Sequence, residues 1–194
     1  MKFKKYQAKA LETALPTDLT PSYLIPMIIG EIGGCFGKVA MSVRDDWSEE
    51  RLNNELAREC GDICWGVALL AKHYGLTKVD RWGTDYRLQT RSQSLHFLLA
   101  DVSALERVTC ESGASGRAQV RHLWLNLEDN CGLLTGHSFD KVLNMSLTKT
   151  SERKGGTVTS GSVPLVTGLT PQDEAQVALA QPGNKPIYIK GITK

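Results

Sequence analysis

The chain has 194 residues, a formal net charge of +2, and an apolar fraction of 41%. A nearly neutral chain lacks the broad cationic field that binds nucleic acid nonspecifically, so we expect no nucleic-acid partner. The longest apolar runs, residues 23–32 and 63–71, fall short of the roughly 20 residues that span a bilayer, and polar residues interrupt the N-terminus where a signal peptide is apolar. We therefore expect a cytoplasmic protein that contacts no membrane.

Helical periodicity dominates the chain up to residue 154. Apolar spacing predicts helices over residues 4–14, 22–44, 48–75 and 87–108, followed by a Gly/Ser turn at 112–116, a shorter helix around 120–127, and a last helix from 138 to about 153. Ser48 is a favourable N-cap, and Gly75 is a favourable C-terminal stop. From residue 155 onward Gly, Ser, Thr and Pro predict loops with at most a short strand near 187–189.

An acidic group stands out on the helix over residues 48–75. Glu55, Glu59 and Asp62 lie at i, i+4 and i+7, which places the three carboxylates on one face. One interpretation is a solvated face whose acids pair with Arg51 and Arg58. The residues alone leave that interpretation open beside a second one, a metal site.

Glu31 favours the metal site, because it lies inside the otherwise apolar, glycine-rich helix over residues 22–44. A carboxylate that is buried without a partner is costly. A divalent cation shared with Glu59 and Asp62 would supply that partner, and oxygen ligands of this kind suit Mg²⁺ or Mn²⁺.

A short basic strip lies on the last predicted helix. Ser146, Lys149 and Arg153 share one face, and a Gly/Ser/Thr-rich loop over residues 155–162 follows them. Basic side chains and exposed backbone N–H groups both bind phosphate oxygens. Acids that hold a metal and bases that hold phosphate form a more specific combination than either group alone.

These residues carry a resemblance to a known family. The stretch Gly30-Glu31-Ile32-Gly33-Gly34 and the later stretch Glu59-Cys60-Gly61-Asp62-Ile63-Cys64-Trp65 resemble the MazG family of all-α nucleoside triphosphate pyrophosphohydrolases, whose signature is E-x-x-E on one helix and E-x-x-D on the next. Residues 146–158 are similar to the family's N-x-x-K-x-x-x-R segment and the G-t-i that follows. The resemblance covers about residues 3–80 and 138–162.

The resemblance implies an all-α, MazG-type helical bundle over residues 1–162, with a helical insertion at 81–137 and an irregular C-terminal arm of unknown role at 163–194. It implies Mg²⁺-dependent cleavage of a nucleoside triphosphate to the monophosphate and pyrophosphate. Glu31, Glu59 and Asp62 would be the catalytic metal ligands. The residues expected to contact phosphate or nucleoside are Lys38, Lys149, Arg153, Ser146, Asn144, Gln7 and Trp65.

The chain departs from the family pattern at two positions. Gly34 stands where the second Glu of E-x-x-E is expected, and Ser146 stands where the family has Asn, with Asn144 two residues earlier. Glu55 is the nearest replacement for the missing metal ligand, and other acids open to that role are Asp45, Asp46 and Asp140.

Two other functions remain open at the level of sequence: a catalytically impaired relative that binds a nucleotide or a protein partner without hydrolysis, and a helical interaction module. The resemblance also implies a homo-oligomer, either a dimer or a tetramer. The apolar stripe over residues 87–108 is a candidate for the subunit interface, and packing inside its own protomer is the alternative.

Overall fold

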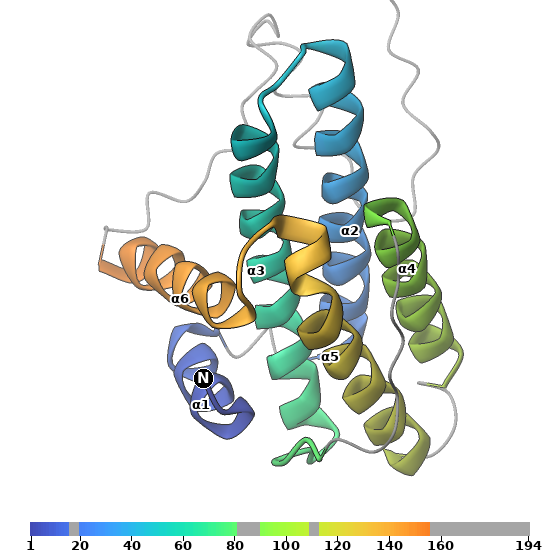
Figure 1. Ribbon diagram of the computed structural model, residues 1–194. Coiled ribbons are helices and arrows are strands. Elements are labelled where there is room, and N and C mark those ends of the chain that lie inside the picture. Colours follow the sequence, from blue (N-terminus) through green and yellow to red (C-terminus); the bar gives the residue numbers. More distant parts are fainter. Residues whose placement is uncertain (16–19, 81–89, 109–112, 156–194) are drawn as a thin grey trace, which may run out of the picture. The chain divides into compact units, whose positions relative to one another are not determined.

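The computed structural model describes residues 1–15, 20–80, 90–108 and 113–155. These residues form helices and no strand (Figure 1), which confirms the expected all-α class. The helices are α1 (Phe3–Thr13), α2 (Pro21–Arg44), α3 (Glu49–His73), α4 (Arg91–Val108), α5 (Gly113–Thr135) and α6 (Phe139–Gly155). Met1–Gly155 is one compact unit, and the arm and short strand expected after it lie outside the described residues.

The hairpin of α2 and α3 provides the frame for the candidate site. Both predicted end signals of α3 are confirmed: the Ser48 hydroxyl accepts a hydrogen bond from the Arg51 backbone N–H at 3.2 Å, and Gly75 adopts a left-handed φ of 69° after the helix. The two helices approach closely at Gly66, where a Cβ atom would lie 2.4 Å from the Met27 Cε atom. A larger residue at position 66 would force the Met27 and Ile28 side chains to shift.

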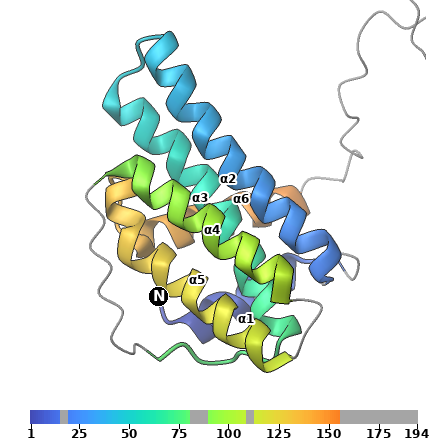
Figure 2. The same cartoon turned by 90° about the vertical axis from the view of Figure 1, so that its right-hand side faces the viewer.

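Helices α4 and α5 pack against this hairpin, α4 along α2 and α5 along α3 (Figure 2). The apolar stripe of α4 is at most 1% exposed, so it fills the core of its own protomer and is not available as a subunit interface. Its buried members are Leu95, Leu98, Val102 and Leu105. Arg91 at the start of α4 fixes the arrangement, because its guanidinium donates to the Leu134 carbonyl at 2.8 Å and to the Asn53 side-chain oxygen at 2.6 Å.

Helix α5 is longer than predicted. It begins at Gly113, inside the segment 112–116 that was expected to be a turn. The reason lies at Gly116, where a Cβ atom would be 2.3 Å from the Tyr74 ring. Glycine disfavours a helix by propensity, but here its missing side chain makes room for an aromatic ring from another element. Tertiary packing therefore overrides the local turn signal.

Helix α2 matches the helix expected over residues 22–44. It has 24 residues and reaches a mean hydropathy of 1.5, which is long and apolar enough, by length and composition, to cross a membrane. Such a helix is weak evidence for a membrane span, so the expectation that the chain contacts no membrane stays a prediction. A mostly buried core helix passes the same test; here α2 packs against α3 and α4, and 28% of this apolar stretch is buried.

Candidate metal centre

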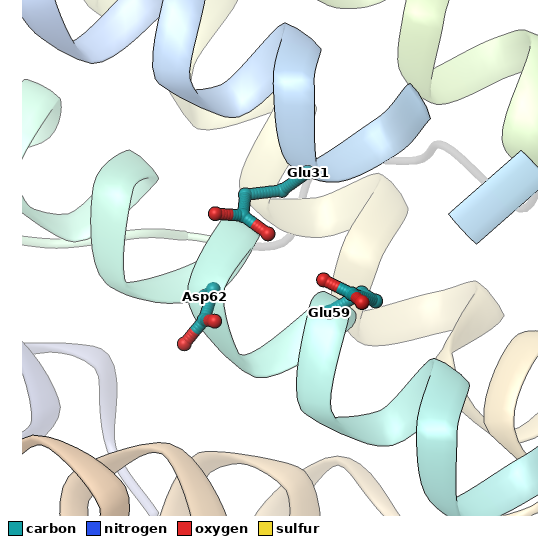
Figure 3. Close-up of side chains that lie close together, drawn as sticks. All are labelled: Glu31, Glu59 and Asp62. Atoms are coloured by element: carbon teal, nitrogen blue, oxygen red, sulfur yellow. The ribbon is translucent and has the colours of Figure 1, made fainter. Parts of the chain in front are cut away.

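Three carboxylates from two helices converge at the middle of the hairpin. Figure 3 shows Glu31 reaching from α2 toward Glu59 and Asp62 on α3. One oxygen from each side chain lies within 4.8 Å of the other two, and all three side chains are partly buried. The structure thus brings together the acids that the sequence singled out, which we call the carboxylate trio.

Burial and charge repulsion act on Glu31. Burial is the largest effect, and with the hydrogen bond to Glu59 and the nearby charge of Asp62 it raises the pKa of Glu31 to about 7, from an ordinary value of 4.5. In the absence of a cation Glu31 therefore takes up a proton at a higher pH than an ordinary carboxyl group does. A bound divalent cation favours the ionised carboxylate and would displace that proton.

This raised pKa predicts how stability depends on pH. The folded protein binds the Glu31 proton more tightly than the unfolded chain does, so the stability from this group is present below pH 4.5 and is lost as the pH rises through about 7. We expect the melting temperature of the metal-free protein to fall between about pH 5 and about pH 8. In the Glu31→Gln variant the melting temperature should fall less steeply with pH over this range. Identical slopes in the two proteins, measured by circular dichroism with a chelator present, would contradict the raised pKa.

Two lysines from neighbouring helices flank the trio. The Lys149 ammonium on α6 contacts the Asp62 Oδ2 atom, and the Lys38 ammonium on α2 lies 3.8 Å from the Glu59 Oε1 atom. The basic strip expected on the last helix thus reaches the acids through Lys149. Arg153 also lies in α6, but its side chain falls outside the described part of the chain. Ammonium groups at these positions are able to pair with phosphate oxygens.

Glu55 is engaged by cations. Its carboxylate lies 3.0 Å from the Lys38 ammonium and 2.9 Å from the Arg58 guanidinium, and the hydrogen bond to Lys38 lowers the pKa of Glu55. The expected pair with Arg58 is therefore present. Arg51, the other expected partner of the acids, instead places its guanidinium 4.0 Å from the centre of the Trp47 ring.

The departure at position 34 lies at the site itself. A Cβ atom on Gly34 would be 3.3 Å from both the carboxyl carbon and the Oε2 atom of Glu59. A side chain there would face the trio, so the place for a fourth carboxylate is next to Glu59. Two of the proposed replacements pair elsewhere, Asp45 with Arg44 at 2.6 Å and Asp140 with the N-terminal amine.

Ser146, one of the residues expected to contact phosphate, has its hydroxyl engaged in packing. It is 3% exposed, accepts a hydrogen bond from the Tyr6 hydroxyl at 3.1 Å, and donates one to the Gly61 carbonyl at 2.9 Å. These bonds fix α1 and α6 on α3 directly beside Asp62. The sequence gives no sign of this, because Tyr6 lies 140 residues before Ser146.

The packing role of Ser146 predicts a loss of stability on truncation. Ser146→Ala leaves the buried Tyr6 hydroxyl without its acceptor, which should cost about 1–2 kcal/mol in urea unfolding. Ser151→Ala, on the exposed side of the same helix, is the matched control and should change little. Unchanged stability in Ser146→Ala together with a raised KM for nucleotide would restore the substrate-contact interpretation.

The side-chain donors of Gln7 and Trp65 are also engaged in packing. The Gln7 amide, 5% exposed, donates to the backbone carbonyls of Ala68 at 3.2 Å and Leu76 at 3.0 Å. The Trp65 indole N–H donates to the Thr13 hydroxyl at 2.9 Å. Both residues fasten α1 to α3, and both donors are engaged within the protein.

A groove of about 990 Å³ lies beside the trio, lined by residues of α3 and α6. Lys149 belongs both to this groove and to the trio's surroundings, and the exposed Asn144 lines the groove as well. Arg58 and Lys141 add two more cations to the lining, and Glu152 adds one anion. Lys141 was missed in the sequence, although it lies about two helical turns before Lys149, a spacing that keeps both on neighbouring sides of α6.

The side chains of this region define what it is able to bind. Oxygen ligands from three carboxylates suit a hard divalent cation, and the lysines and Arg58 suit an anion beside it.

Comparisons with family models, curated proteins and solved structures find no match to this chain. Together the trio and the groove place oxygen ligands for a cation near basic groups that suit an anion.

Proposed function

We propose that the chain is a Mg²⁺-dependent nucleoside triphosphate pyrophosphohydrolase, which converts a ribo- or deoxyribonucleoside triphosphate and water to the monophosphate and pyrophosphate. The observation that carries this proposal is the convergence of Glu31, Glu59 and Asp62 within 4.8 Å, with Lys149 in contact with Asp62. The resemblance in the E-x-x-D segment supports the same reaction.

The donor set fits the ion that this reaction needs. Burial, the hydrogen bond to Glu59 and the nearby charge of Asp62 raise the pKa of Glu31, and a divalent cation would compensate the charge of these acids. Glu31, Glu59 and Asp62 would hold Mg²⁺, or Mn²⁺ in its place. When bound, such an ion neutralises phosphate charge and makes water a better nucleophile.

The protein's own residues then bind and orient the substrate. Lys149 and Lys38 would pair with phosphate oxygens, and Arg58 would extend the cationic surface along the groove. Water attacks the α-phosphorus, the bond from that phosphorus to the bridging oxygen breaks, and pyrophosphate leaves. The proton of the attacking water passes to a carboxylate. Holding the triphosphate in line with the water is the main contribution of the lysines.

A panel of nucleoside triphosphates and deoxynucleoside triphosphates, incubated with the full chain and Mg²⁺ or Mn²⁺, tests the proposal. Orthophosphate is measured with and without added inorganic pyrophosphatase. Cleavage between the α- and β-phosphates yields orthophosphate only when pyrophosphatase is present. Orthophosphate without pyrophosphatase would show cleavage of the terminal phosphate, and no orthophosphate in either case would remove the enzymatic function.

A second candidate is a protein that binds a nucleotide, or a protein partner, without hydrolysing the nucleotide. Gly34 favours it, because the position faces Glu59 and supplies no ligand. In that case the panel gives no cleavage, while nucleotide with Mg²⁺ raises the melting temperature. If neither effect occurs, a helical interaction module with a charged surface becomes the better account.

A further inference from the structure

The Lys149 ammonium is paired with Asp62, one of the carboxylates that a metal ion would need as a ligand. Its ammonium contacts the Asp62 Oδ2 atom, and the Lys149 and Asp62 side chains are 33% and 15% exposed. Packing holds α6 at this position relative to Asp62. Ser146, one turn before Lys149 on α6, donates a hydrogen bond to the carbonyl of Gly61, the residue next to Asp62. The backbone is held while the long lysine stem stays free to turn.

We infer that Lys149 and the divalent cation compete for Asp62, and that a phosphate group of the substrate ends the competition by taking Lys149. This inference rests on the proposed function. An ammonium and a divalent ion at one carboxylate oxygen repel each other, so full coordination by Asp62 requires Lys149 to move.

The groove places Lys149 within reach of a second partner. Its side chain lines the groove of about 990 Å³ that Arg58 and Asn144 also line. A triphosphate in this groove brings several anionic oxygens within reach of the lysine, and these replace Asp62 as its partner. The pair with Asp62 is partly exposed, so the competition it exerts is modest and reversible.

The consequence is that cation and triphosphate strengthen each other's binding. A cation alone must displace Lys149 from Asp62, whereas a cation arriving with the triphosphate finds Lys149 drawn away. Because such coupling is reciprocal, the cation raises the affinity for the triphosphate by the same factor. Lys149 thus makes the chain select a metal–nucleotide complex over a free metal ion.

The test is a Mn²⁺ titration of the full chain without nucleotide, followed by electron paramagnetic resonance of the free ion. Lys149→Met should bind Mn²⁺ about two- to fivefold more tightly than the wild type, while its nucleotide cleavage falls. Lys149→Arg keeps the charge and should bind Mn²⁺ as the wild type does. Lys72→Met, which removes one exposed charge from the end of α3, controls for the change in net charge.

The outcomes separate the inference from the proposed function. If the wild type cleaves nucleotide and Lys149→Met binds Mn²⁺ no more tightly than the wild type, competition at Asp62 is refuted and the enzymatic proposal stands. An equal gain in Lys149→Met and Lys72→Met would also refute it, because the effect would then be one of net charge. If no protein in the series binds Mn²⁺ and the wild type cleaves no nucleotide, both fail together.

Discussion

Replacing Glu59 by Gln, or Asp62 by Asn, should lower pyrophosphate release by about a hundredfold or more, since each change removes one charged ligand from a set of three. The substitutions keep the size of the side chain, so the fold should be retained. Removal of one negative charge from the crowded trio should even leave the metal-free melting temperature unchanged or higher. Such a gain in stability on loss of function is typical of sites in which like charges are held together.

The matched control is Glu50→Gln, which removes an exposed carboxylate from the first turn of α3. Its pyrophosphate release should equal that of the wild type. Turnover is measured with pyrophosphatase added, and folding by circular dichroism and thermal unfolding. Wild-type turnover in both Glu59→Gln and Asp62→Asn would refute the assignment of the metal ligands, whatever the nucleotide specificity.

Gly34→Glu is expected to create a stronger metal site. The new Cβ atom would lie 3.3 Å from the Glu59 carboxyl carbon, so the added carboxylate starts beside the trio. With a fourth oxygen ligand, the affinity for Mn²⁺ should rise by about tenfold. In the metal-free protein the added charge increases the repulsion within the trio, and the melting temperature should fall until Mg²⁺ is supplied.

Two controls isolate the cause of that gain. Gly34→Gln has the same length without the charge and should bind Mn²⁺ as the wild type does. Gly37→Glu adds the same charge about one turn further along α2, where a Cβ atom meets nothing within 4 Å, and it should have only a small effect. An unaltered Mn²⁺ titration in Gly34→Glu would mean that another acid already completes the site.

Local signals explain what the sequence predicted well. Helix ends at Ser48 and Gly75 depend on a cap and a left-handed residue, which are properties of a few neighbouring residues. The convergence of Glu31 with the acids of α3 followed from a single physical demand, the need of a carboxylate in an apolar helix for a partner. That demand holds whatever the rest of the fold.

Long-range packing explains what the sequence did not predict. Ser146 and Gln7 carry polar groups that suit substrate binding, and only the meeting of α1, α3 and α6 shows that these groups bond within the protein. From the sequence, Gly116 predicts a turn; in the structure, the Tyr74 ring packs against this glycine within a helix. The stripe of α4 was equally compatible with a subunit interface and with the protomer's own core, since apolar periodicity does not identify the surface it packs on.

The central claim is that the carboxylate trio directs cleavage between the α- and β-phosphates of a nucleoside triphosphate. The most direct test is a ³¹P nuclear magnetic resonance spectrum of a nucleoside triphosphate incubated with the full chain and Mg²⁺, with Glu59→Gln in parallel. The account predicts signals of the monophosphate and of pyrophosphate in equal amounts, absent with Glu59→Gln. Signals of the diphosphate and orthophosphate, or the same products from Glu59→Gln at the wild-type rate, would contradict it.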